Sequence, residues 1–105
     1  MAVYVDDFEV DATVDGKRRR WSHLVADTHD ELVQFARKLR LSTSWIQRRG
    51  TLREHYDVTS AVRRRALAMG AVPVDYVQMQ AVLDRKALTM VVDAEQVSLP
   101  AAFSS

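Results

Sequence analysis

Alternating apolar and polar residues near the start of the chain predict β-strands. Residues 3–5 (VYV) form a β-branched and aromatic run that ends at an acidic pair, and residues 19–26 (RRWSHLVA) alternate with the period of a strand. Trp21 and His23 therefore share one face of the second strand. Asp15–Gly16 is a turn signal flanked by runs that can pair, so we expect a hairpin or a long loop there.

A helical period follows over residues 27–41 (DTHDELVQFARKLRL). Thr28 and Glu31 match a capping box, in which each side chain hydrogen-bonds the free backbone N–H of the other residue. Acidic residues cluster in the first turn and basic ones in the last turn, as the helix dipole favours. The apolar stripe consists of Leu32, Phe35, Ala36 and Leu39. This stripe predicts a helix that packs one face on a sheet.

The middle of the chain is expected to contain a third strand and a second helix. Residues 42–49 (STSWIQRR) are interpreted as the strand, which favours a core position for Trp45. The segment that follows is expected to be a loop. The helix is then expected to begin near Thr59, with Asp57 or Thr59 as its N-cap, and to end at Gly70.

The last part of the chain is expected to contain a fourth strand and a third helix. Residues 71–77 (AVPVDYV) are interpreted as a strand, and Pro73 favours an edge position because proline cannot donate to the ladder. Residues 77–90 have helical composition, residues 89–93 (TMVVD) suggest a last short strand, and residues 98–105 lack periodicity. The order β-β-α-β-α-β-α predicts an α+β or small α/β fold, with a short mixed sheet of about four strands covered by two or three helices.

Length and composition indicate a single domain over residues 1–105. The chain has 105 residues, 48% hydrophobic and 28% charged side chains, and no cysteine. The lack of cysteine excludes disulfides and thiolate metal sites and fits a reducing compartment. The start lacks a signal-peptide pattern, and no apolar run approaches the roughly 18 residues of a membrane span. We therefore expect a cytosolic, that is cytoplasmic, protein with no membrane partner.

Charge is distributed unevenly along the chain, although the net charge is only +1. Residues 1–16 carry 5 acidic and no basic side chains, residues 17–65 carry 13 basic and 5 acidic ones, and residues 66–105 carry 2 basic and 4 acidic ones. We expect the acidic start to fold back and neutralise the basic middle. The alternative is a basic middle that faces an anionic partner.

Several blocks of the sequence together resemble a known family. They are VYVDD (3–7), WSHLVADTHDEL (21–32), FA (35–36), WIQ (45–47), HYDV (55–58), Arg63 and GA (70–71). The combination resembles the small bacterial and bacteriophage proteins catalogued as domain of unknown function 4031. It covers residues 1–76 and leaves a C-terminal helix and tail at residues 77–105. Ala61 and Val62 stand where that family often has Ser-Lys. The resemblance implies a shared fold and shared polar positions, and it transfers no reaction.

Polar residues gather at the predicted strand ends and helix starts, where binding sites form in open α/β sheets. The candidate ligand-binding residues are Asp6, His23, His55, Tyr56, Asp57, Arg63 and Arg64. His23, His55 and Asp57 are also candidate metal ligands, because imidazole and carboxylate groups bind divalent cations. The chain has no glycine-rich phosphate loop, no nucleophile elbow and no close-spaced histidine pair.

Each candidate also has a structural explanation. His23 is then a core histidine that donates to a strand carbonyl, and Asp57 is the N-cap of the second helix. His55 lies in an expected loop, where packing alone explains it less well. Arg63 to Arg65 span about 200° of a helix, so at most one or two of them point at a ligand and the run otherwise forms a solvated face.

Three functions remain open from the sequence. The favoured hypothesis is a domain that binds an anionic or nucleotide-like small molecule through His, Asp and Arg side chains. One alternative is a metal-dependent hydrolase that uses Asp6, His23, His55 and Asp57. The other is a phage-type nucleic-acid or protein-interaction module that uses the basic middle, and a nucleic-acid partner is less favoured. No motif indicates a cofactor, and both enzymatic activity and self-association stay open.

Overall fold

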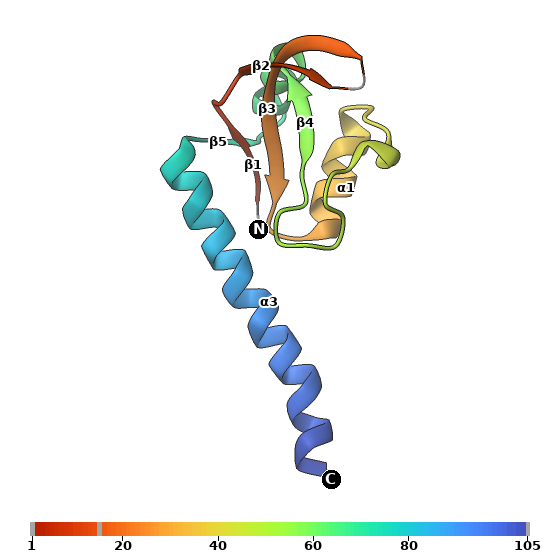
Figure 1. The fold of residues 1–105 in the computed structure, drawn as a ribbon, viewed down its shortest axis with the longest axis vertical. Coiled ribbons are helices and arrows are strands. Elements are labelled where there is room, and N and C mark those ends of the chain that lie inside the picture. The colour runs from red at the N-terminus through yellow and green to blue at the C-terminus, as the bar shows by residue number, and fades with distance from the viewer. Residues whose placement is uncertain (1, 15, 105) are drawn as a thin grey trace.

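A computed structural model describes the backbone of residues 2–14 and 16–104 and the side chains of residues 2–13 and 18–90. The elements are β1 (Val3–Asp6), β2 (Val10–Val14), β3 (Lys17–Ala26), α1 (His29–Lys38), the 3-10 turn η1 (Thr43–Trp45), β4 (Tyr56–Thr59), α2 (Ser60–Ala68), β5 (Val72–Val74) and α3 (Tyr76–Ser104). The five strands form one mixed sheet, and the C-terminal part of α3 projects away from the rest of the domain (Figure 1). The expected α+β class is confirmed, and β2 completes the predicted hairpin as an additional strand.

β3 is the central strand because it pairs along both of its edges. Leu24 lies opposite Val5 of β1 and also opposite Tyr56 of β4, so β1 and β4 flank β3 on different sides. β2 pairs with the first half of β3, on the same side as β1. β5 adds a parallel strand to the outer edge of β1.

Glycine and proline stand where their backbone properties are needed. Gly16 turns the β2–β3 hairpin at a φ of +77°, a left-handed conformation that favours glycine, and Asp15 lies outside the described residues. Gly70 follows α2 at a φ of +104° and ends that helix, as predicted. Pro73 lies in the edge strand β5, as predicted, so its missing N–H removes no inner ladder bond.

A bulge separates β1 from β2 along the edge of β3. Residues 6–9 stand opposite only Ser22 and His23. Asp6 Oδ1 accepts a hydrogen bond from the backbone N–H of His23 at 2.9 Å. Ser22 Oγ accepts one from the backbone N–H of Glu9 at 3.1 Å, and Glu9 has a φ of +44°. Side chains thus replace ladder bonds here, and the bulge turns the Asp6 carboxylate toward β3.

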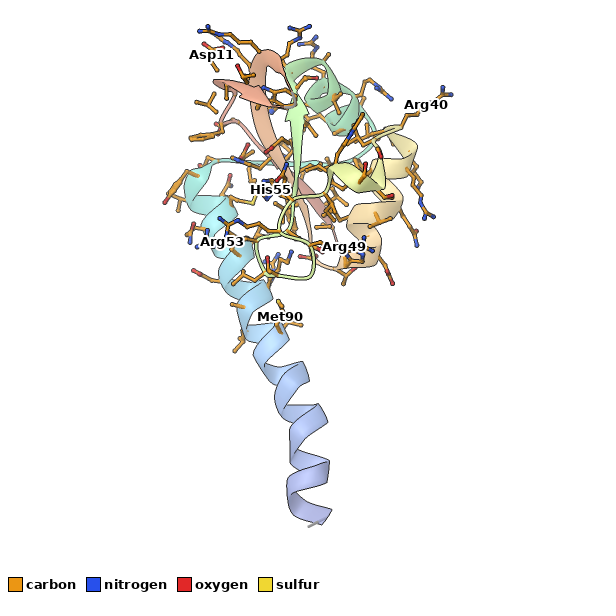
Figure 2. The ribbon with its side chains drawn as sticks, turned by 45° about the vertical axis from the view of Figure 1, so that its right-hand side comes forward. Asp11, Arg40, Arg49, Arg53, His55 and Met90 are labelled. Carbon is orange, nitrogen blue, oxygen red and sulfur yellow. The ribbon has the colours of Figure 1, made fainter. Side chains whose placement is uncertain are left out.

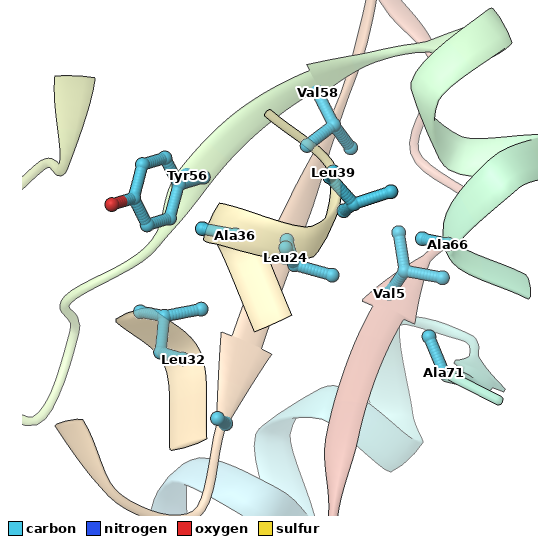
Figure 3. Packing of buried hydrophobic residues seen from close by; sticks show 10 residues of the cluster. Val5, Leu24, Leu32, Ala36, Leu39, Tyr56, Val58, Ala66 and Ala71 are labelled. Carbon is cyan, nitrogen blue, oxygen red and sulfur yellow. The ribbon is translucent and has the colours of Figure 1, made fainter. Parts of the chain in front are cut away.

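The two faces of the sheet carry separate apolar clusters. The larger one joins the sheet to α1 and α2 (Figure 3), and its buried members are Val5, Leu24, Ala26, Leu32, Ala36, Leu39, Tyr56, Val58, Ala66 and Ala71. The smaller one joins the sheet to α3, and its buried members are Tyr4, Val25, Val74, Met79 and Val82. The predicted alternation along β3 is confirmed, because Leu24 packs in the first cluster and Val25 in the second. His23 shares the α3 face with Val25.

Both helices of the middle region begin at a predicted N-cap. Thr28 Oγ1 accepts from the N–H of Glu31 at 3.2 Å, which is the first bond of the predicted capping box. The Glu31 carboxylate accepts from the Thr28 hydroxyl at 2.9 Å, whereas the box requires it to accept from the Thr28 N–H. Thr59 Oγ1 accepts from an N–H in the first turn of α2 at 3.3 Å. Asp57, the alternative cap, lies in β4 instead.

The predicted strand over residues 42–49 is wrong. This segment forms η1, where Ser42 Oγ accepts from the N–H two residues on at 3.3 Å, because short hydroxyl side chains compete for the backbone. Trp45 is 50% exposed, so its expected core position is wrong as well. The strand on the side of β3 opposite to β1 and β2 is β4, which lies in the segment expected to be a loop. Gln47 forms only an isolated bridge with His55.

The predicted last strand over residues 89–93 is also wrong, because α3 is one continuous helix, Tyr76–Ser104, and residue 105 lies outside the described residues. A strand needs a neighbouring edge, and α3 projects away from the sheet in this region (Figure 1). Asp75 and Gln78 begin the helix by exchanging side-chain bonds to each other's N–H, at 2.8 and 2.9 Å. Within the described residues, no helix combines the length and apolarity needed to cross a membrane.

Contacts between the acidic start and the basic middle are few. Asp11 and Arg20 form an exposed ion pair at 3.8 Å, of a kind that stabilises little. The shortest contact between an acidic side chain of the start and a side chain of the middle segment joins Asp6 Oδ2 to His23 Nδ1, at 2.6 Å. The described arginines of the middle segment are exposed except for Arg63, so the expected neutralisation is only partial.

Asp27 ties the start of β1 to the end of β3 and to α3. Its carboxylate accepts hydrogen bonds from the N–H of Ala2 (2.8 Å) and the hydroxyl of Tyr4 (3.1 Å), and Arg85 of α3 lies 3.4 Å away. Burial by itself raises the pKa of Asp27, but these bonds and the Arg85 charge outweigh burial, so the pKa lies below its ordinary value. A charged Asp27 therefore stabilises the fold.

The substitution Asp27→Asn is expected to lower the free energy of unfolding at pH 7 by about 1–2 kcal/mol, because charged hydrogen bonds are lost. Since the folded pKa is the lower one, this contribution is complete above the unfolded value of about 3.9 and disappears as the pH falls through the folded value. Urea unfolding of both proteins from pH 7 to pH 2 measures the difference. A difference that stays constant across this range contradicts the role given to Asp27.

Candidate functional site

The pairing of β3 with β4 brings a cluster of polar side chains together on the α3 face of the sheet. His23 lies directly opposite Asp57 in the register, and His55 precedes Asp57 by two residues, which puts both on the same side of the chain. The rings of His23 and His55 meet edge to face with their centroids 5.2 Å apart. His55 Nε2 lies 3.3 Å from Asp57 Oδ1. His23 of β3 thus meets His55 and Asp57 of the β4 segment at one point on the sheet.

Asp6 holds the ring of His23 from the side of β1. The Nδ1 of His23 lies 2.6 Å from Asp6 Oδ2, and Asp6 is only 7% exposed. The hydrogen bond from Asp6 raises the pKa of His23 against the opposing effect of burial. Burial raises the pKa of Asp6, but its hydrogen bonds from His23 lower that pKa by more. Asp6 therefore occupies one ring nitrogen of His23 and leaves Nε2 available.

His55 has the same arrangement with a different partner. Its Nδ1 lies 2.8 Å from the backbone carbonyl oxygen of Arg53, and since a carbonyl only accepts, Nδ1 carries the hydrogen. In a neutral ring, Nε2 then presents a lone pair toward the carboxylate of Asp57. The hydrogen bond with His55 lowers the pKa of Asp57 despite burial, so this carboxylate is charged at neutral pH. A lone pair facing a carboxylate needs a proton or a metal ion between them.

The cluster has the donor atoms and spacing of a divalent cation site. One ligand atom each from His23, His55 and Asp57 lie within 4.8 Å of one another. For bonds of about 2.1 Å, neighbouring ligands of a tetrahedral ion are about 3.4 Å apart, close to the separation of 3.3 Å between His55 and Asp57. Metal-binding histidines usually donate their second N–H to a carboxylate or a carbonyl, and Asp6 and Arg53 supply these two groups here.

A cavity of about 350 Å³ opens beside this cluster. Its acidic, basic and imidazole side chains are Asp6, Asp7, His23, Arg48, Arg53 and His55. Arg48 and Arg53 are exposed and form no ion pair with a described residue. Arg53 and His55 lie on the segment that runs past α3 (Figure 2). The cavity therefore combines a potential metal site with two unpaired positive charges.

Glu54 fixes the loop that carries these arginines. Its side chain is 3% exposed and accepts hydrogen bonds from the N–H of Gly50 at 3.1 Å and from Nδ1 of His29 at 2.9 Å. The second bond attaches the loop to α1. Arg48 has a φ of +52°, and its carbonyl accepts the hydroxyl of Thr51 at 2.7 Å. The loop is thus a hydrogen-bonded turn, which limits the positions that its arginines reach.

The comparison with protein families adds the identity of the domain. Residues 3–86 match the family described as "Protein of unknown function (DUF4031)". The chain belongs to the DUF4031 family. No curated protein and no solved structure matches the chain. The matched region of this DUF4031 protein includes the cluster, the lining of the cavity and the part of α3 that packs on the sheet.

The structure brings some of the sequence candidates of this DUF4031 protein together and separates others. Asp6, His23, His55 and Asp57 are neighbours. Arg63 donates from Nε to the backbone carbonyl of Asp6 at 2.7 Å, so it supports the end of β1 without lining the cavity. Tyr56, Arg63 and Arg64 are all outside the cavity lining, and Arg64 is exposed.

Sequence reasoning missed Arg48 and Arg53, because nothing in their local pattern distinguishes them from the other arginines. The run Arg63 to Arg65 drew attention by its density, whereas Arg48 lies next to Arg49 at an expected strand end and Arg53 lies alone in an expected loop. Their position depends on the buried carboxylate of Glu54, which is a tertiary contact. Glu54 would have indicated an ordered loop at this place only if its burial had been known in advance.

Tyr56 belongs to the core and not to the site. It is 1% exposed and lies on the opposite face of the sheet from His55 and Asp57. Its hydroxyl points away from the other residues of the larger apolar cluster (Figure 3). That hydroxyl is buried and has no hydrogen-bond partner among the described residues. The substitution Tyr56→Phe is therefore expected to leave ligand binding unchanged and to raise the free energy of unfolding by up to about 1 kcal/mol. Loss of more than about 1 kcal/mol in chemical denaturation contradicts this assignment.

Proposed function

We propose that this DUF4031 protein binds one divalent metal ion through His23 Nε2, His55 Nε2 and the Asp57 carboxylate, and uses it to hydrolyse a small anionic substrate. One observation carries the proposal: Nε2 of His55 faces the charged carboxylate of Asp57 at 3.3 Å, while its Nδ1 is held by a carbonyl. A cation at this point satisfies both groups. The third ligand, His23, has its own Nδ1 held by Asp6.

A proton on each imidazole is the competing explanation of the same contacts. The raised pKa of His23 is compatible with it, since Asp6 and Asp57 both favour the charged ring. Two charged rings would then lie with their centroids 5.2 Å apart, next to Arg48 and Arg53 in one cavity. A single metal ion would take the place of the proton on Nε2 of each ring, and the bonds that Nδ1 of His23 and Nδ1 of His55 form would stay unchanged. Metal titration separates the two explanations.

Three protein ligands leave open coordination positions on the ion. A bound ion would lower the pKa of a water molecule held there and so supply a nucleophile at neutral pH. The water oxygen would bond to the electrophilic atom of the substrate, the bond from that atom to the leaving group would break, and the leaving group would receive a proton from the water. Asp7 lines the cavity and is exposed, so it is available to carry this proton. Arg48 and Arg53 offset the charge of an anionic substrate.

Titration of the full chain with Zn²⁺, Mn²⁺ and Co²⁺ tests the proposal. We expect one equivalent of metal per chain and release of protons on binding, because imidazole must be deprotonated to act as a ligand. The loaded protein should hydrolyse p-nitrophenyl phosphate, and a chelator should stop the reaction. Absence of metal uptake contradicts the proposal, and uptake without any metal-dependent hydrolysis contradicts its catalytic part.

The substitution Asp6→Asn is expected to weaken metal binding by about 10- to 100-fold, which is the usual effect of removing a group that orients a ligand. The Asn amide presents N–H where Asp6 Oδ2 now accepts from His23, so the ring favours the tautomer with hydrogen on Nε2. That nitrogen then no longer binds metal. Isothermal titration with Zn²⁺ measures the change, and an unchanged affinity shows that Asp6 does not orient His23.

Anion capture without chemistry is the second candidate, and it is supported by the two unpaired arginines of the cavity, Arg48 and Arg53. In this case inorganic phosphate should raise the melting temperature of the metal-free protein, through preferential binding to the folded state. The same shift should persist in the presence of a chelator. Stabilisation by phosphate that requires metal instead supports the hydrolase.

A further inference from the structure

Part of the cavity wall beside the metal ligands is apolar and exposed. Its apolar lining consists of Phe8, Val25, Tyr76, Met79 and Leu83. Phe8 is 60% exposed and Tyr76 is 69% exposed, which is unusual for aromatic side chains in a concave surface. The ring of Phe8 lies at 31° to that of His23, with 5.6 Å between their centroids. An apolar and aromatic lining with a few polar groups is the usual composition of a small-molecule pocket, and an exposed aromatic ring offers a face on which another ring can stack.

The remaining lining has the opposite character. Arg48 and Arg53 extend from the loop that Glu54 holds, and their planar guanidinium groups match the oxygens of a phosphate by paired hydrogen bonds. Gln80 of α3 adds an amide that both donates and accepts. The cavity is therefore divided between a cationic part for a dianion and an aromatic part for a flat group. Two of the three candidate metal ligands, His23 and His55, line the same space.

We propose that the substrate is a phosphomonoester whose other half is a flat, partly apolar ring, the chemistry of a nucleoside monophosphate or an aryl phosphate. This inference rests on the proposed metal centre. A volume of about 350 Å³ lies near the lower end of the range for small-molecule sites, about 300–1,000 Å³, so it suits one small molecule. Hydrolysis consumes one water: its oxygen bonds to phosphorus, the phosphorus–oxygen ester bond breaks, and the products are the free alcohol or phenol and inorganic phosphate.

Three probes separate the two halves of the substrate. Calorimetric titration of the zinc-loaded full chain uses phenylphosphonate, which carries both halves and is not hydrolysed, methylphosphonate, which lacks the ring, and benzyl alcohol, which lacks the anion. We expect phenylphosphonate to bind at least about tenfold more tightly than methylphosphonate, because it buries a ring. Benzyl alcohol should show no measurable binding. Equal affinities for the two phosphonates overturn the inference.

Substitutions in the cavity test the same division in the protein. The double substitution Arg48→Gln and Arg53→Gln should weaken both phosphonates at least about tenfold, since charged hydrogen bonds to the anion are lost. The change Phe8→Ala should weaken only phenylphosphonate. The matched controls are Arg64→Gln and Val77→Ala, which alter an exposed arginine and an exposed apolar residue outside the cavity lining and should change neither affinity. Equal effects of Phe8→Ala on both probes overturn the ring assignment.

The outcomes distinguish this inference from the proposed function. If the chain takes up zinc but does not prefer phenylphosphonate, the metal centre stands and the substrate class is wrong. If the chain takes up no zinc and phenylphosphonate still binds through the arginines, the ligand class stands and the hydrolase is wrong. A metal-loaded protein that hydrolyses p-nitrophenyl phosphate and also shows the expected order of affinities supports both.

Discussion

The substitution His55→Ala is expected to weaken zinc binding by at least about 100-fold and to abolish metal-dependent hydrolysis. Loss of a group that only orients a ligand costs about 10- to 100-fold, so loss of a ligand itself should exceed that range. His55 is the central member of the proposed set, because it contacts both the ring of His23 and the carboxylate of Asp57. Its removal leaves two ligands, too few to hold the ion. Isothermal titration with Zn²⁺ measures the affinity, and p-nitrophenyl phosphate reports the activity.

His29 provides the matched control for this experiment. It is the remaining histidine of the chain, its side chain is 39% exposed, and its Nδ1 also contacts a carboxylate, at 2.9 Å on Glu54. His29 belongs neither to the lining of the cavity nor to the group of candidate metal ligands. The variant His29→Gln keeps an amide N–H that can donate to Glu54, so it should bind zinc as the parent does, with folding of both variants checked by circular dichroism. Similar zinc affinities for His55→Ala and the parent chain contradict the proposed ligand set.

The substitution Leu24→Ala is expected to lower the free energy of unfolding by about 3–4 kcal/mol, within the range for buried leucines. Leu24 is fully buried at the centre of β3, paired on both sides and packed under α1 and α2, so the cavity left by alanine cannot easily close. For a domain of this size such a loss lowers the melting temperature by more than about 10 °C. Chemical denaturation and a thermal scan together measure the effect.

Leu88 is the control for burial. It is 67% exposed on α3, so Leu88→Ala should change the free energy of unfolding by less than about 0.5 kcal/mol. Both substitutions delete the same atoms, and only their surroundings differ. If the two variants unfold at the same denaturant concentration, Leu24 does not occupy the centre of the core that supports the site.

The predictions from sequence were correct where the deciding contacts lie within a few residues of each other. The N-cap bond from the Glu31 N–H to Thr28 joins residues three apart, and Gly70 ends α2 through its own backbone conformation. The alternation along β3 was also predictable, because a half-buried strand repeats every two residues. Each of these features depends only on residue types at short spacing, so the sequence alone predicts it.

One failure was local: residues 42–49 have alternating character, but a serine hydroxyl bond over two residues starts η1 in this segment. The other failures occurred where the presence or absence of a distant partner decided the structure. The segment 56–59 was expected to be a loop and becomes β4 because the free edge of β3 supplies its partner. At residues 89–93 the reverse occurs: the apolar run has no strand edge beside it and stays helical. The position of a partner edge is not encoded in any short window.

The same division applies to the candidate site. The sequence alone nominated Asp6, His23, His55 and Asp57 as candidates because of their positions at predicted strand ends and in the loop before a helix. On the same grounds it also nominated Tyr56, Arg63 and Arg64, which the structure places outside the cavity lining. Only the tertiary structure decided that His23 pairs with Asp57 across β3 and β4, since strand register is set by the packing of both sheet faces. It also decided which arginines line the cavity, through the buried contacts of Glu54 on a loop that local pattern leaves undefined.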